Sequence, residues 1–255
     1  MGGEMSGNAA DDDPIHLFCQ VVADDLEMLA VLHDREADAA LLQTLKAERF
    51  PSGLGLRLES EAGREASAAL SALLERMPSE LDEEFLDELA SDFADIYLNN
   101  TLSASPLESV WIDEEGLICQ EPMFQVRAWY KRFDLAVPDW RKRPDDHLVA
   151  QLQFISKVVR KAGADSLSEM ATFMDEHLLR WLPEFAERVS TRCATAYYSA
   201  LVYLTSAYVA EMREMIAEIT GEPVPTKEEI DERMKPKVDP VEVPVAYMPG
   251  MEPSW

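Results

Sequence analysis

Apolar residues recur at helical spacing along most of the chain, and this feature constrains the fold more than any other. Leu81, Phe85, Leu89, Phe93 and Ile96 follow one another three or four positions apart, which places their side chains on one face of an α-helix. Similar stripes lie at 15–32, 41–45, 70–77 and 148–159. We find no convincing strand pattern with a period of two. The sequence therefore predicts an all-α fold of many helices.

Prolines and capping residues predict where several helices begin and end. Ser79-x-x-Asp82 resembles a capping box at the start of one helix, since the serine oxygen can accept a free backbone N–H. A helix that begins near Ser166 should end after Trp181, and Pro183 should begin another. The longest helix is predicted at 194–220.

The composition changes after Gly221, because seven of the 15 prolines lie in the final 35 residues. Thr226-x-x-Glu229 predicts a capped helix at 226–234, and the rest of this tail should be flexible. We therefore expect a disordered N-terminus at 1–13, an all-helical domain at 14–221 and a Pro-rich tail at 222–255. Two helical halves of the domain should meet near 134–147.

Charge and cysteine content restrict the partners and the compartment. The net charge is −26, which disfavours binding to nucleic acid or to an anionic membrane surface. It favours a basic partner such as an arginine-rich peptide, although acidity also serves simply to keep a protein in solution. Three widely spaced cysteines without a Cys-x-x-Cys pair fit a reducing cytoplasm. The chain contains no run of 18 apolar residues, so no membrane span is predicted.

Signatures of catalysis are missing from the sequence. It contains no phosphate-binding glycine loop of either common type. A di-iron bundle would need paired Glu-x-x-His motifs on facing helices, and the chain has none. We therefore predict no catalytic residue, no metal site and no cofactor, and expect a binding protein rather than an enzyme.

The most distinctive stretch runs from 103 to 154. It contains two irregular segments, one at 106–116 that carries Trp111 beside Asp113, and one at 136–143. Pro144-Asp145-Asp146-His147 follows the second segment and opens a helix. Irregular segments that carry aromatic, acidic and histidine side chains between helices are typical of binding surfaces.

The motifs in and after this stretch resemble those of the TorD/DmsD/NarJ family of cytoplasmic chaperones for molybdenum-containing redox enzymes. They are Pro106-x-x-Ser109-Val110-Trp111-Ile112-Asp113, Trp129-Tyr130, Pro144-x-Asp146-His147, His177-Leu178-x-x-Trp181-x-Pro183-x-Phe185 and Ala196-Tyr197-Tyr198-x-x-Leu201. They occur in the family's order over about half of the chain. The chain departs from the family at Arg143, where a Glu is usual, and at Asp134, where a Gly is usual.

This resemblance implies a helical chaperone that binds the N-terminal leader of a molybdoenzyme catalytic subunit. The leader would be of the twin-arginine type, and the chaperone would hold the subunit until its cofactor is inserted. The resemblance and the loop positions together give seven candidate peptide-binding residues: Pro106, Trp111, Asp113, Tyr130, Pro144, Asp146 and His147. The chaperone would act as a monomer or as a domain-swapped dimer.

Simpler structural roles are open for several of these residues. Asp146 and His147 also suit the first turn of a helix, as a capping acid and a packed histidine, and Trp111 suits a core position. His177, Trp181 and Tyr197 are assigned to packing. The acids Glu114, Glu115, Asp134, Asp139 and Asp145 should mostly form a solvated face.

Two other functions remain open from the sequence. A chaperone of the same family could bind an internal or leaderless segment, as NarJ-like members do. From a different class, an acidic helical adaptor or regulator could bind another partner protein. The identity of the partner would separate these, because only the chaperone needs a molybdoenzyme subunit.

Overall fold

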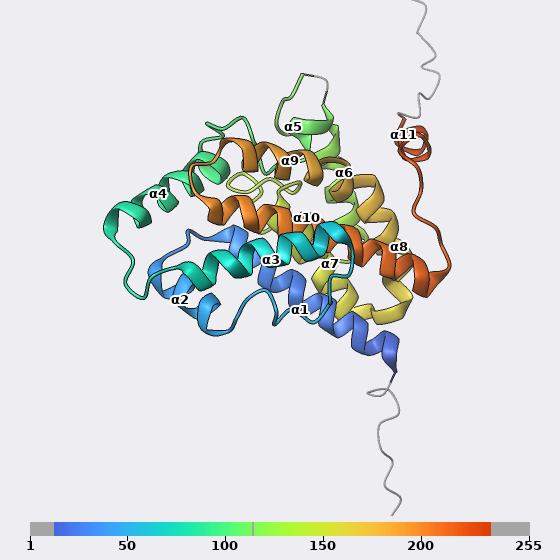
Figure 1. Cartoon of the computed structure of the whole chain (residues 1–255). Helices are drawn as coiled ribbons and strands as arrows, with labels where there is room; N and C mark the ends of the chain where they lie inside the picture. Colours follow the sequence, from blue (N-terminus) through green and yellow to red (C-terminus); the bar gives the residue numbers. More distant parts are fainter. Residues whose placement is uncertain (1–12, 114, 236–255) are drawn as a thin grey trace, which may run out of the picture. The chain divides into compact units, whose positions relative to one another are not determined.

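The computed structural model describes residues 13–113 and 115–235, and these residues form helices joined by loops (Figure 1). The helices are α1 Pro14–Asp34, α2 Ala39–Ala47, α3 Glu61–Arg76, α4 Glu83–Phe93, η1 Ala94–Leu98, α5 Ser109–Ile112, α6 Glu121–Arg132, α7 Leu148–Ala162, η2 Gly163–Ser166, α8 Leu167–Phe173, η3 Met174–Leu178, α9 Leu179–Arg192, α10 Ala196–Thr220 and α11 Lys227–Met234. The described chain has no β-strand, so the predicted all-α class is confirmed. None of its helices has the length and apolarity needed to cross a membrane.

The chain divides into two compact units, residues 1–224 and 225–255. In the first unit α10 is the central element, because it contacts α9, α3, α8, α1 and α4. Figure 1 shows α3 and α9 running alongside α10. The side chains of Tyr197, Tyr198, Leu201 and Tyr208 on α10 are fully buried. The apolar stripes of the sequence thus face one shared core.

One polar group in this core is the imidazole of His33, which is 1% exposed. Its Nε2 lies 2.8 Å from Oγ1 of Thr205, whose own hydroxyl donates to the carbonyl of Leu201 at 2.9 Å. The threonine oxygen therefore accepts from Nε2–H, and Nδ1 accepts from the hydroxyl of Tyr97 at 2.6 Å. This neutral form fits the burial, which lowers the pKa of His33 to about 3.

Side-chain caps begin several helices. The carboxylate of Asp82 accepts from the backbone N–H of Phe85 at 2.8 Å and begins α4, so the predicted cap at Ser79 is wrong. Asp82 is favoured there because Glu83 is already helical, and the residue that caps a helix must directly precede it. The capping box of Thr226 and Glu229 is confirmed.

The predicted helix break at Pro183 is also wrong, because Pro183 lies inside α9. An interior proline removes one hydrogen bond and costs about 3 kcal/mol. The side chains of Trp181, Leu182 and Phe185 on either side of it are fully buried. Each contributes about 1.5–3 kcal/mol by burial, and together they outweigh that cost. The helical path therefore continues from Gly163 to Arg192, through the π-helical turn η3.

The second unit contains α11, and the predicted helix at 226–234 is confirmed. The prediction of a disordered N-terminus lies outside the described residues except at Asp13, whose side chain caps α1. The predicted flexible tail lies outside them from residue 236 onward. That two halves of the domain meet near 134–147 stays a prediction.

Candidate functional site

The irregular segment at 106–116 lies against residues 144–148, which follow the second irregular segment and lead into α7. Leu107 and His147 form an isolated antiparallel bridge. The backbone N–H of Glu108 donates to the carbonyl of Asp146 at 3.1 Å, and that of Leu148 donates to the carbonyl of Pro106 at 2.9 Å. We call the contact between residues 105–109 and 144–148 the loop junction. It brings Pro106, Asp146 and His147 together.

Asp146 is the centre of the loop junction and is 0% exposed. Its Oδ2 accepts from the backbone N–H of Ser109 at 2.8 Å and from the hydroxyl of Ser109 at 2.5 Å. Burial raises the pKa of Asp146, and the two bonds from Ser109 act in the opposite direction. The residue precedes α7 rather than lying in its first turn. The carboxylate therefore points into the molecule, bonded through Oδ2, and is not exposed to solvent.

His147 caps α7. Its Nδ1 accepts from the backbone N–H of Val149 at 3.1 Å, so this nitrogen carries no proton. Burial and the nearby positive charge of Arg143 lower the pKa of His147 to about 3. Pro144 is half-buried before the helix, and its carbonyl accepts from the N–H of His147 at 3.2 Å. Both residues shape the turn into α7.

Glu108 is a functional neighbour that sequence reasoning missed. Its carboxylate is fully buried, with Oε1 2.9 Å from Nδ1 of His177 and Oε2 accepting from Nε2 of Gln151 at 2.7 Å. Glu108 therefore ties the loop junction to α7 and to η3. An acid between Leu107 and Val110 was the only sequence signal for this burial. His177 is buried, as are Trp181 and Tyr197, which confirms the packing roles predicted for these three residues.

Asp145 is not part of a solvated face as predicted, since it is 3% exposed. Its Oδ2 accepts from Nε and Nη2 of Arg127 on α6, at 3.0 and 2.7 Å. The hydroxyl of Tyr130 donates to the carbonyl of Asp145 at 2.8 Å. Burial raises the pKa of Tyr130 well above its usual value. The phenol group thus holds the loop from inside and does not reach solvent.

Trp111 and Asp113 lie on α5 and just after it. The half-buried Trp111 donates from Nε1 to the carbonyl of Ser105 at 2.8 Å and packs edge-on against Phe185, with ring centroids 6.3 Å apart. Asp113 accepts at Oδ2 from the backbone N–H groups of Glu115 and Leu117, both at 3.1 Å. It therefore orders the turn that leads towards α6. Glu114, predicted as one of the surface acids, lies outside the described residues.

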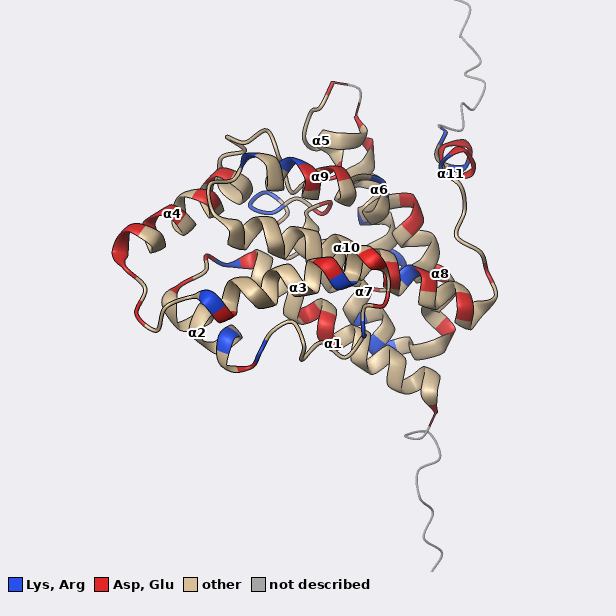
Figure 2. Cartoon of the chain, in the orientation of Figure 1, with Lys and Arg blue, Asp and Glu red and all other residues tan. Residues whose placement is uncertain are grey.

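Beyond this turn several large apolar side chains are exposed to solvent. They are Leu117, Ile118, Phe124 and Trp140, which we call the apolar patch. Phe124 and Trp140 approach each other across one guanidinium, because Cζ of Arg127 lies 5.5 Å and 4.8 Å from their ring centroids. Figure 2 shows acidic residues on the loop after α5, next to Leu117 and Ile118 in the sequence. Further acids lie on α4, in another part of the molecule.

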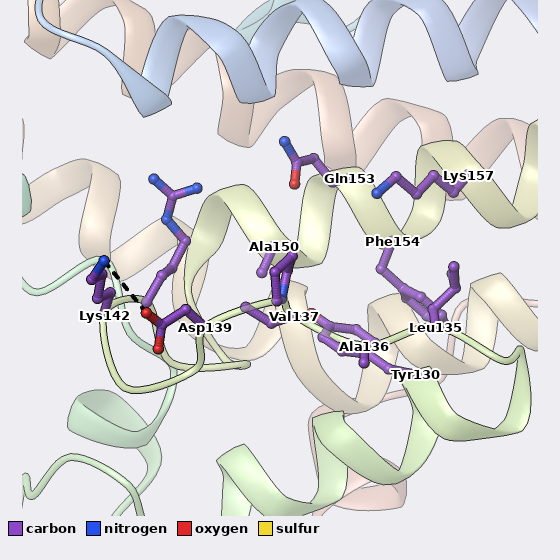
Figure 3. Close-up of a pocket in the computed structure, with 12 residues that line it drawn as sticks. Tyr130, Leu135, Ala136, Val137, Asp139, Lys142, Ala150, Gln153, Phe154 and Lys157 are labelled. Atoms are coloured by element: carbon purple, nitrogen blue, oxygen red, sulfur yellow. Dashed lines mark ion pairs between the residues drawn. The ribbon is translucent and has the colours of Figure 1, made fainter.

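A pocket of about 310 Å³ lies beside the patch, between the 135–143 loop and α7 (Figure 3). Its lining residues are Tyr130, Leu135, Ala136, Val137, Pro138, Asp139, Lys142, Arg143, Ala150, Gln153, Phe154 and Lys157. Tyr130 is the one predicted site residue among them. Five of the predicted site residues thus hold the two loops from below the surface: Pro106, Tyr130, Pro144, Asp146 and His147. Other residues form the exposed surfaces beside them.

The arrangement is suited to binding rather than to bond chemistry. Each buried acid of the loop junction is hydrogen-bonded to groups of this same chain. Among residues 13–113 and 115–235, no three His, Cys, Asp or Glu side chains are grouped to hold a metal ion.

Comparison with known proteins gives the family. The family described as nitrate reductase delta subunit matches residues 59–187, about half of the chain and the whole loop junction. The chaperone protein TorD of Vibrio cholerae serotype O1 is 31% identical over 196 residues, which are 73% of this chain and 86% of the relative. TorD of Vibrio vulnificus is 27% identical over 175 residues, covering 65% of this chain and 79% of the relative.

These relatives are named as chaperones and not as enzymes, and the match spans both segments of the loop junction with the helices that hold them. The chain belongs to the TorD/NarJ family of chaperones that serve the maturation of molybdenum-containing redox enzymes.

Proposed function

We propose that this chaperone binds the N-terminal leader of a molybdoenzyme catalytic subunit in the cytoplasm and holds the subunit until its cofactor is inserted. The leader is of the twin-arginine type in this proposal. The observation that supports it best is the apolar patch with exposed carboxylates beside it. A leader combines an apolar stretch with arginines, and this surface offers a complement to each.

The apolar part of the leader should supply most of the affinity. Phe124 is 49% exposed and Trp140 37% exposed, and each can lose much of this exposed area against a bound peptide. Covering apolar surface stabilises a complex by about 25 cal/mol per Å² before the costs of ordering are subtracted. Exposed large apolar side chains that occur near one another, as Phe124 and Trp140 do on either side of Arg127, commonly mark interaction sites.

The arginines of the leader should meet carboxylates at the edge of the patch. Glu115 and Glu121 are exposed on either side of Leu117 and Ile118. Arginine and carboxylate form charge-assisted hydrogen bonds, but exposed pairs contribute only about 0.2–1 kcal/mol each. The carboxylates therefore serve mainly to select and orient a basic leader.

The candidate residues of the loop junction have a positioning role in this proposal. Asp146 and His147 fix the start of α7, Pro106 and Pro144 shape the two backbone segments, and Tyr130 holds the loop from below. Two further candidates, Trp111 and Asp113, fix the conformation of the turn that leads to Leu117, the first residue of the apolar patch. Loss of any of these should alter leader binding through the fold.

The test first identifies the partner protein and then measures the affinity of the chaperone for that partner's leader peptide. A tagged full-length chain is used to isolate the partner, and mass spectrometry decides whether it is a molybdoenzyme subunit. A fluorescent peptide with that subunit's leader sequence is then titrated against the wild-type protein and the Phe124→Ser and Trp140→Ser variants. We expect the dissociation constant to rise about tenfold for each variant.

The matched control is Tyr203→Ser, because Tyr203 is 44% exposed on α10 and lies away from the patch in sequence and structure. An equal loss of leader affinity in all three variants would refute the apolar patch as the leader-binding site. Recovery of a molybdoenzyme subunit that binds through an internal segment would favour a NarJ-like client mode. Recovery of an unrelated regulatory partner would favour an adaptor. The monomeric or domain-swapped state stays a prediction.

A further inference from the structure

We infer that the pocket between the 135–143 loop and α7 is a second binding site, which takes an apolar group that carries a single negative charge. This site shares no residue with the apolar patch. It is therefore an addition to leader binding, and its test does not depend on the leader.

The floor of the pocket suits an apolar group. The rings of Tyr130 and Phe154 lie there with centroids 4.7 Å apart and planes tilted by 43°, and both side chains are buried. Leu135 and Val137 of the loop are half-buried beside them. Figure 3 shows Tyr130, Leu135 and Phe154 grouped on one side, and Gln153 and Lys157 on α7 along another. A small, mostly apolar hollow with a few polar groups at its edge is the usual form of a ligand pocket.

The charge of the pocket edge is opposite to that of the whole protein. Three cations, Lys142, Arg143 and Lys157, line the pocket with one carboxylate, Asp139, whereas the chain as a whole carries −26. Lys142 lies 3.5 Å from Asp139, and both side chains are largely exposed. The two charges offset each other, and the pair contributes little energy, so a ligand can displace it at small cost.

The remaining two cations differ in their partners. Arg143 forms an ion pair with Asp34 of α1, which ties the loop to the body. Lys157 makes no ion pair with any residue in the described ranges and is exposed at the pocket edge. Its ammonium group is therefore available to a ligand anion. A charge-assisted bond from Lys157, together with the Gln153 amide, would orient the charged end of the ligand while the apolar end covers Phe154.

The same charges exclude the basic part of a leader. An arginine side chain in this pocket would meet the ammonium group of Lys157, while the carboxylates nearest to Lys142 and Arg143 are already paired with those cations, and like charges at close range repel. An acidic residue beside an apolar residue in a client polypeptide fits the pocket, and so does a free organic acid with an aliphatic or aromatic body. Both sources share one chemistry, an anion on an apolar group.

The test compares two dyes that differ in charge. 1-Anilinonaphthalene-8-sulfonate carries one negative charge, and N-phenyl-1-naphthylamine has the same ring system without it. Binding of both is measured by fluorescence in full-length protein that carries Phe124→Ser, so that the apolar patch contributes little. We expect the anionic dye to bind about tenfold more tightly, against the repulsion from the net charge of the protein.

Three variants locate the site. Lys157→Gln should weaken the anionic dye about tenfold and leave the neutral dye unchanged. Lys161→Gln is the matched control, since Lys161 is exposed one turn further along α7 and does not line the pocket, and it should leave both dyes unchanged. Val137→Trp fills the hollow and should remove both. Circular dichroism verifies that each variant retains its helix content.

Two results would overturn the inference: equal affinity for the two dyes, or equal effects of Lys157→Gln and Lys161→Gln. Displacement of the anionic dye then distinguishes the sources. Acetyl-Leu-Glu-Leu-amide should compete better than acetyl-Leu-Gln-Leu-amide if the ligand is a client segment, and octanoate should compete better than both if it is a free acid. Failure of the acidic peptide and octanoate alike would also overturn it. Loss of leader binding leaves all these readouts unaffected.

Discussion

Replacing Asp146 by alanine should destabilise the fold rather than remove a ligand contact. The carboxylate is fully buried and accepts two hydrogen bonds from Ser109, one from the backbone and one from the hydroxyl. A buried donor that loses its acceptor costs about 1–3 kcal/mol. The serine hydroxyl can rotate towards another acceptor, but the backbone N–H cannot. Removing a buried carboxylate offsets part of this cost, so we expect Asp146→Ala to lower the free energy of unfolding by about 1–2 kcal/mol.

The assay is urea unfolding at pH 7, followed by circular dichroism, with the slope of the transition required to stay constant. Asp146→Asn retains an acceptor and should cost about half as much. A double-mutant cycle with Ser109→Ala measures the bond between the side chains, for which we expect about 1.5–3 kcal/mol, as for hydrogen bonds to charged groups. The account would be refuted if Asp146→Ala lowered the free energy of unfolding by less than about 0.5 kcal/mol and weakened leader binding in the folded protein. Asp146 would then contact the leader directly.

Three further outcomes follow from the charges of the structure. His33 and His147 have pKa values of about 3 in the fold, against 6.5 when exposed. Their contribution to the stability of the fold is therefore complete above pH 6.5 and declines as the pH falls. The contribution of each histidine to the free energy of unfolding should fall by up to about 2 kcal/mol at pH 5. His147→Asn should therefore flatten the pH dependence of the urea midpoint. An unchanged pH dependence would contradict the assigned neutral forms. Arg127→Gln strands the buried Asp145 and should cost about 3 kcal/mol of unfolding free energy, whereas Arg132→Gln, at an exposed pair, should change it by under about 1 kcal/mol. Leader affinity should weaken as salt shortens the screening length from about 10 Å at 0.1 M to about 3 Å at 1 M, and constant affinity would mean that apolar contact alone recognises the leader.

The helices were predictable because their signal is local. The part of the stripe from Phe85 to Ile96 lies in α4 and η1, with Leu81 just before the helix. Thr226 and Glu229 formed the predicted capping box. Pro183 was misread because its cost is set by the burial of its neighbours, which a local rule does not include. Ser79 was misread because Asp82, three residues later, provides the better-placed oxygen.

The sequence indicated chain segments that meet in the fold, whereas the peptide-binding role of their residues stays a prediction. The motif residues Pro106, Asp146 and His147 do come together, as the ordered family motifs implied. Their burial could not be read from the sequence, because it results from pairing two backbone segments some 40 residues apart. Asp145 was expected in solvent for the same reason, since its partner Arg127 lies 18 residues away on another helix.

The central place of α10 has a consequence for how the chaperone itself is made. This helix is the last one in the first compact unit, yet α1, α3, α4, α8 and α9 all pack on it. During synthesis the earlier helices emerge before the partner that covers their apolar faces, and such contacts between distant parts of a chain form late. The apolar faces of the earlier helices in the nascent chaperone are therefore incompletely covered until Thr220 has been added.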